Sequence, residues 1–158
     1  GRSWVWKPKT DNIKMITEET TVNYIRSEMD STHISTDSAF INDKFWLLIP
    51  FQLVWDTSAT ISEAKKMESP IHKTPLNMIT ITYSKQGGYT PGDAYDIFYD
   101  NNYIIKEWVF RKGNSKKPSL TTTFENYKDY NGIKVATEHK QEDGNWNLNF
   151  TNITVTLK

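Results

Sequence analysis

The second half of the chain alternates between apolar and polar residues in short stretches that turn residues separate. In residues 78–83, Ile79 and Ile81 fall on one face of an extended strand and the intervening threonines on the other. Asn131-Gly132, a dipeptide that favours a two-residue hairpin, joins two later stretches. The pattern predicts antiparallel strands over residues 78–83, 94–99, 103–111, 119–130, 133–138 and 146–157.

Turn residues mark the ends of these strands. Gly87-Gly88 breaks the chain, and Asp-Asn-Asn at 100–102 favours positive φ in a tight turn. Further turns are predicted at 90–93 and 142–145. In the last strand the apolar positions change from even to odd numbers, the odd set ending at Leu157. A straight strand that faces one core cannot change parity, so we predict a β-bulge or a sharp bend near Thr151-Asn152.

The first half of the chain is less regular. Residues 2–7 and 13–19 are predicted as strands around a turn at 8–12, and residues 20–29 fit either a strand or a loop. Apolar spacing predicts a helix over 38–48, which Pro50 is expected to end. Residues 61–67 hold helix-forming residues in a short segment. Together these elements predict one mainly β (α+β) domain over residues 1–158, an antiparallel sheet with one or two short helices.

Composition narrows the class of protein. The 158 residues carry 19 basic and 19 acidic side chains, and each half of the chain is close to balanced. A nucleic-acid-binding protein or a polybasic membrane anchor needs clustered positive charge, so we expect neither. No apolar run reaches the roughly 20 residues that a membrane span needs, and we predict none. The absence of cysteine removes cysteine-held metal sites, iron–sulfur clusters and disulfides.

Candidate catalytic groups are few. His33, His72 and His139 lie far apart in polar stretches without a metal-binding spacing, so we interpret all three as surface residues. Asp93 and Asp96 form a carboxylate pair near a turn, and a hydrolase built on them and a histidine is the most remote hypothesis. We predict no cofactor, no metal site and no catalytic residue, and we expect that the protein is not an enzyme.

A basic cluster occupies the end of one predicted strand and the loop after it. Its members are Lys106, Arg111, Lys112, Lys116 and Lys117. One interpretation is a solvated loop at the tip of a hairpin. The other is a positive patch that faces an acidic partner or lipid headgroups.

The most apolar segment is residues 45–55, in which ten of eleven residues are apolar. It either crosses the core or lines a cavity under a curved sheet, where Pro50 would separate a helix from an extended plug. Aromatic residues of the predicted strands would complete such a cavity. The candidate ligand-binding residues are Trp46, Leu47, Phe51, Trp55, Phe98, Trp108 and Phe110.

Three segments carry a resemblance to a known family. Residues 45–56, FWLLIPFQLVWD, resemble a segment of export-associated proteins from Bacteroidetes-type bacteria. Residues 90–100, TPGDAYDIFYD, with 103–108, look like the Pro-Gly-Asp hairpin of the same subgroup. Residues 127–137, YKDYNGIKVAT, are similar to a strand pair of the outer-membrane lipoprotein carrier and sorting superfamily, which has the LolA/LolB-like fold.

The resemblance implies a curved antiparallel half-barrel sheet that one or two short helices close. Its apolar cavity would accept acyl chains, and the chain would lack the N-terminal part of the full fold. We expect a non-catalytic protein of the periplasm, or one tethered to the outer membrane, whose export signal is absent from this chain. Its ligand would be an acyl chain, a lipid or another apolar molecule held in the concave face of the sheet. The alternative is a structural or protein-interaction module of an envelope assembly, with an envelope protein as partner and no small-molecule ligand.

Overall fold

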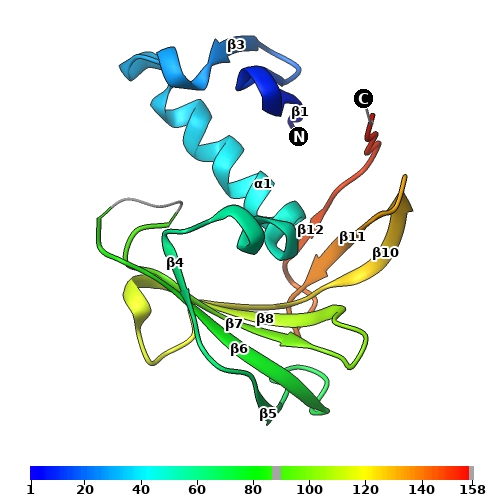
Figure 1. Cartoon of the computed structure of the whole chain (residues 1–158). Coiled ribbons are helices and arrows are strands. Elements are labelled where there is room, and N and C mark those ends of the chain that lie inside the picture. Colours follow the sequence, from blue (N-terminus) through cyan, green and yellow to red (C-terminus); the bar gives the residue numbers. More distant parts are fainter. Residues whose placement is uncertain (87–89, 157–158) are drawn as a thin grey trace. The chain divides into compact units, whose positions relative to one another are not determined.

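A computed structural model describes residues 1–86 and 90–156 of the protein (Figure 1). The described residues are mainly β, as predicted, and form three antiparallel sheets and one α-helix. Packing divides the chain into two compact units, residues 1–46 and 47–158. Helix α1 (Ile34–Trp55) contributes residues to both units. The predicted chain break at Gly87-Gly88 and the position of Leu157 lie outside the described residues.

The first unit holds a three-stranded antiparallel meander, which confirms the two strands predicted near the N-terminus. The open choice at residues 20–29 resolves as a strand followed by a 3-10 turn. The strands are β1 (Ser3–Lys7), β2 (Asn12–Ile16) and β3 (Thr21–Ile25). Trp4 and Trp6 point to one side of β1 and pack edge-on against Phe40 of α1, with ring centroids 5.4 and 5.7 Å away. Ile13 and Tyr24 complete this core.

Helix α1 is longer than predicted, because it runs through Pro50 and ends at Trp55. A proline inside a helix removes one backbone hydrogen bond and crowds the preceding turn, at a cost of about 3 kcal/mol. Ile49 and Gln52, on either side of Pro50, are fully buried. We attribute the continuity of the helix to this packing, which outweighs the local penalty. The prediction that Pro50 ends the helix is therefore wrong, and so is the prediction of an extended plug after it.

The second unit contains a six-stranded sheet in which β4 and β5 both pair with the edge of β6. Its strands are β4 (Ala59–Ile61), β5 (Lys65–Glu68), β6 (Pro75–Tyr83), β7 (Ala94–Tyr99), β8 (Ile105–Arg111) and β9 (Leu120–Thr123). Residues 61–67 thus supply edge-strand residues, although their composition favours a helix, because backbone pairing with β6 decides their conformation.

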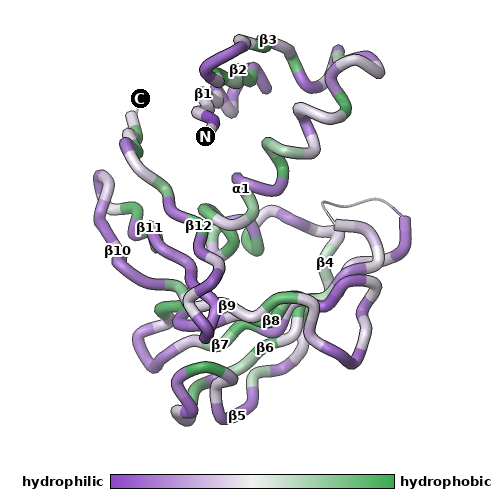
Figure 2. Tube along the Cα trace, turned by 180° about the vertical axis from the view of Figure 1, so that it is seen from behind, coloured by the Kyte–Doolittle hydropathy of each residue, from purple (hydrophilic) through white to green (hydrophobic). Residues whose placement is uncertain are grey.

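Apolar residues cover both faces of the central strands. Ile97 of β7 lies opposite Trp108 of β8, and both side chains are buried. Met78, Phe98 and Val109 form a separate buried cluster on the other face. Figure 2 shows the result as hydrophobic residues interleaved along β6, β7 and β8, whereas β10 is hydrophilic. The central strands of this sheet are therefore packed on both faces.

The predicted strand over 119–130 is in fact two strands that belong to different sheets, because the strand is interrupted at Phe124. This residue is buried and packs between Trp108 and His139, with ring centroids 5.3 and 4.3 Å away. The second sheet of this unit consists of β10 (Glu125–Tyr130), β11 (Ile133–Lys140) and β12 (Asn147–Asn149). The alternation of apolar and polar residues continues through Phe124 and gives no sign of this interruption, so the sequence predicted one continuous strand.

The predicted turns agree with the backbone at most positions. Asn131 and Gly132 have φ of 57° and 87°, the left-handed values that a two-residue hairpin requires. The bend near Thr151-Asn152 is confirmed, since Asn152 has φ of 55° and the last strand ends at Asn149. In the turn at 100–102 the positive φ falls one residue later, on Tyr103, at 60°.

Candidate functional site

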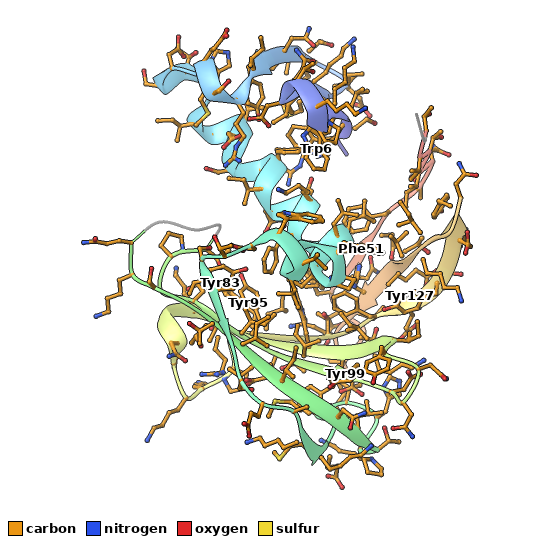
Figure 3. The ribbon with its side chains drawn as sticks, in the orientation of Figure 1. Trp6, Phe51, Tyr83, Tyr95, Tyr99 and Tyr127 are labelled. Atoms are coloured by element: carbon orange, nitrogen blue, oxygen red, sulfur yellow. The ribbon has the colours of Figure 1, made fainter. Side chains whose placement is uncertain are left out.

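A pocket of about 230 Å³ lies in the second unit, beside the start of β8 and the β10–β11 hairpin. Its lining includes three aromatic rings, from α1, the turn before β8 and β10. The lining residues are Pro50, Phe51, Tyr103, Ile104, Ile105, Tyr127, Gly132 and Lys134. Figure 3 shows Phe51 on α1 and Tyr127 on β10, two of the rings that border it. The wall is apolar, and Lys134 supplies one charged group.

The structure distributes the seven predicted ligand-binding residues over several places. Phe51 alone among them lines the pocket just described. Trp108 and Phe110 share a face of β8 and each contact Tyr95, at centroid distances of 5.1 Å, while Phe98 belongs to the opposite face. Trp55 is 48% exposed at the end of α1. Trp46 is buried in the first unit and Leu47 is half-buried in the second.

Tyr103 stands out at the mouth of the pocket. Its side chain is 81% exposed, and its φ of 60° is rare for a bulky residue. The turn holds it in place, because Asp100 accepts the backbone N–H of Tyr103 at 3.0 Å through its carbonyl. The ring stacks on Tyr99 with planes 17° apart and centroids 5.9 Å apart. Sequence reasoning missed this residue, because an exposed tyrosine in a turn carries no pattern signal.

Tyr127 of β10 is another of the residues that line the pocket. Its hydroxyl donates to the Ile105 carbonyl at 2.8 Å. This bond connects β10 to β8 of the six-stranded sheet. Burial, with a smaller effect of the Asp100 charge, raises the pKa of Tyr127 well above its usual value. The hydroxyl therefore stays protonated and remains a donor across the physiological range.

Removing this hydroxyl with Tyr127→Phe should lower the free energy of unfolding by about 1 kcal/mol, since one carbonyl loses its donor. Urea denaturation measures the change. Tyr130→Phe, on the same strand and with no hydrogen bond of its hydroxyl in the described residues, is the matched control. Equal effects of the two substitutions would contradict the role of the bond.

A buried carboxylate, Glu107 of β8, lies on the other face of the sheet. It is fully buried and accepts bonds from Ser69 Oγ at 2.8 Å, the Ile71 N–H at 2.7 Å and the His72 N–H at 2.9 Å. The His72 ring approaches the same carboxylate at 2.6 Å through Nδ1. Burial raises the pKa of Glu107, but these donors outweigh it and hold the pKa below its usual range. Because Ser69 bonds the carboxylate and not the imidazole, the arrangement anchors a turn and differs from a nucleophile–base pair.

The histidine interpretation holds only in part. His33 and His72 are partly exposed and contact Asp30 and Glu107, respectively. His139 is fully buried, which contradicts the prediction of a surface residue. Its parity on β11 places it against Phe124 and Phe150, so the polar neighbours in sequence were a poor guide. Burial lowers the pKa of His139 to about 4.

The carboxylate pair and the basic cluster serve local structure. Asp96 accepts Thr80 Oγ1 at 2.7 Å and pairs with Arg111 at 2.9 Å. Asp93 accepts the Gly113 N–H at 2.8 Å in the following loop. Lys106 pairs with Asp100 at 3.3 Å, whereas Lys112, Lys116 and Lys117 are exposed. Two of the five basic residues are therefore already balanced by acidic side chains.

Comparisons with protein-family models, with curated proteins and with solved structures give no match for this chain. Within residues 1–86 and 90–156, no helix combines the length and the apolarity that crossing a membrane requires. In the same residues, no group of three or more histidine, aspartate or glutamate side chains is placed to hold a metal ion.

Proposed function

We propose that the protein is a non-catalytic binding module of the cell envelope that holds an apolar group in the Phe51–Tyr103–Tyr127 pocket. The observation that carries this proposal is the pocket's aromatic wall, which three separate elements build. Burial of alkyl surface against such a wall contributes about 0.8 kcal/mol per CH₂. Such binding needs no reactive group.

The size of the pocket limits what it holds. At about 230 Å³ it exceeds the cavities of about 150 Å³ that accept benzene. It is smaller than the roughly 300–1,000 Å³ of sites for drug-sized ligands. A single ring or a short alkyl segment fits this volume, and several acyl chains of a lipoprotein do not. The proposed ligand is therefore one short apolar group or the end of one acyl chain.

Membership in the LolA/LolB-like superfamily, with its half-barrel, belongs to the same proposal. Its support is the antiparallel sheet of the second unit and the Asn131-Gly132 hairpin, which lies in one of the similar segments. A periplasmic or outer-membrane-tethered location follows from this membership and from no other observation. Native mass spectrometry of protein from a bacterial host, with organic extraction, would identify a retained lipid or fatty acid.

Replacing Tyr103 with asparagine should weaken ligand binding about tenfold, because the variant removes one exposed wall of the pocket. Asparagine tolerates positive φ, so the turn should persist. The probe is n-octanol, and its affinity is read from shifts of the Ile104, Ile105 and Gly132 amides in ¹H–¹⁵N spectra. Trp55→Ala is the control, since Trp55 is an exposed aromatic residue outside the pocket lining. A loss of affinity with Trp55→Ala alone, or the absence of shifts at these amides, would sink the proposal.

One observation favours the alternative of a protein-interaction module. Val54 and Trp55, adjacent on the last turn of α1, are 86% and 48% exposed. Exposed large apolar residues of this kind are common at protein-binding surfaces. A clean apo mass after incubation with fatty acids and phospholipids, together with no n-octanol binding, would favour this alternative.

A further inference from the structure

One positive charge, from Lys134, lies among the residues that line the pocket. Lys134 sits on β11 opposite Asp129 of β10, on the same face of the hairpin as Tyr127. Its side chain is exposed, and no ion pair of Lys134 occurs within residues 1–86 and 90–156. Asp129 instead accepts the Gly132 N–H at 2.7 Å across the turn. The lysine charge is thus available to a ligand.

One acidic group that acts on this wall, Asp100, is already paired with a cation. Asp100, whose charge acts on Tyr127, accepts the N–H groups of Asn102 and Ile104 at 2.9 and 3.0 Å. It also pairs with Lys106 at 3.3 Å. The pocket therefore combines an apolar wall with the ammonium group of Lys134, which makes no ion pair among the described residues, and the nearby Asp100 is paired with Lys106.

We propose that the pocket selects anionic amphiphiles, namely carboxylates with a short alkyl or aryl tail, whose tail fills the pocket and whose carboxylate meets Lys134. This inference rests on the proposed function and names its ligand class. Aromatic rings alone would attract a cation, but the ammonium group of Lys134 repels one. A neutral amphiphile gains the same apolar burial without the ion pair.

The test compares sodium octanoate, n-octanol and octyltrimethylammonium on the full chain. Binding is read from the amide shifts of Ile104, Ile105 and Gly132 at low salt. The quantity that matters is the ratio of the n-octanol to the octanoate dissociation constant. Lys134→Gln should lower this ratio about three- to fivefold, the amount expected for an exposed ion pair, and added salt should lower it in wild-type protein. Lys134→Glu should turn the preference towards the cationic probe.

Lys128→Gln supplies the matched control. Lys128 is an exposed lysine of the same hairpin, but it lies opposite Val135 on the other face. An unchanged ratio with Lys134→Gln, or an equal drop with Lys128→Gln, would overturn the charge selection and leave the proposed function standing. If n-octanol and octanoate both fail to shift the pocket amides, the proposed function fails as well.

Discussion

Glu107→Gln should lower the free energy of unfolding by about 3 kcal/mol or more. The glutamine amide replaces one accepting oxygen with an NH₂ group, which then faces a backbone N–H of Ile71 or His72. Replacing an accepting oxygen of a buried, fully hydrogen-bonded carboxylate leaves a donor without its acceptor, and such changes cost about 3–5 kcal/mol. Urea denaturation at pH 7 measures the effect. A loss below 1 kcal/mol would contradict the anchoring role of Glu107.

Glu138→Gln is the matched control for this substitution. Glu138 also carries a carboxylate in hydrogen-bonding contact, with Lys140 at 2.7 Å, but on the surface of the second sheet. Solvent screens an exposed pair of this kind, so the control should lose far less stability than Glu107→Gln. Acid adds a second readout. The pKa of Glu107 lies below its usual range, so its stabilisation is complete above the unfolded pKa of about 4.3 and is lost as pH falls through the folded value. The gap between wild type and Glu107→Gln should therefore narrow in acid.

Much of the sheet was predictable because its strands follow the simplest rule of alternation. Strand β7 occupies the predicted residues 94–99, and Asn131-Gly132 adopts the predicted hairpin turn. The errors occur where tertiary contacts override local preference. Pro50 lies inside α1 because its neighbours are buried, and Phe124 breaks a strand because its ring enters a cluster with Trp108.

The site was less predictable than the fold, for a physical reason. The predicted ligand-binding residues are large, apolar and mostly aromatic, as the wall of a cavity would be. The same properties favour burial in a packed core. Trp108, for example, is buried within such a core. The pocket is lined instead by residues of turns and strand ends, such as Tyr103 and Gly132, which no periodicity singles out. Glu107 was missed because one glutamate in a strand gives no sign of the turn that will cover it.

Lowering the pH from 7 to 4 should remove about 3 kcal/mol of stability through His139 alone. Burial lowers the pKa of His139 to about 4, although a bond from Nδ1 to the Thr123 carbonyl at 3.2 Å partly opposes the shift. The unfolded chain takes up this proton near pH 6.5. Between these values the unfolded state binds more protons, so the free energy of unfolding falls as the pH falls. Above pH 6.5 the neutral form prevails in both states and the stabilisation is complete.

Two substitutions separate this titration from packing. His139→Gln and His139→Phe both remove the ionisable group, so the decline between pH 6.5 and 4 should become shallower by about 3 kcal/mol relative to wild type. Phe150→Leu alters a ring at 5.9 Å from the same imidazole and keeps the titration, so it should shift the whole curve without changing its slope. Urea denaturation at half-unit pH steps gives these curves. If the slopes for wild type and both His139 variants coincide, His139 titrates normally in the folded protein and is not buried as a neutral imidazole.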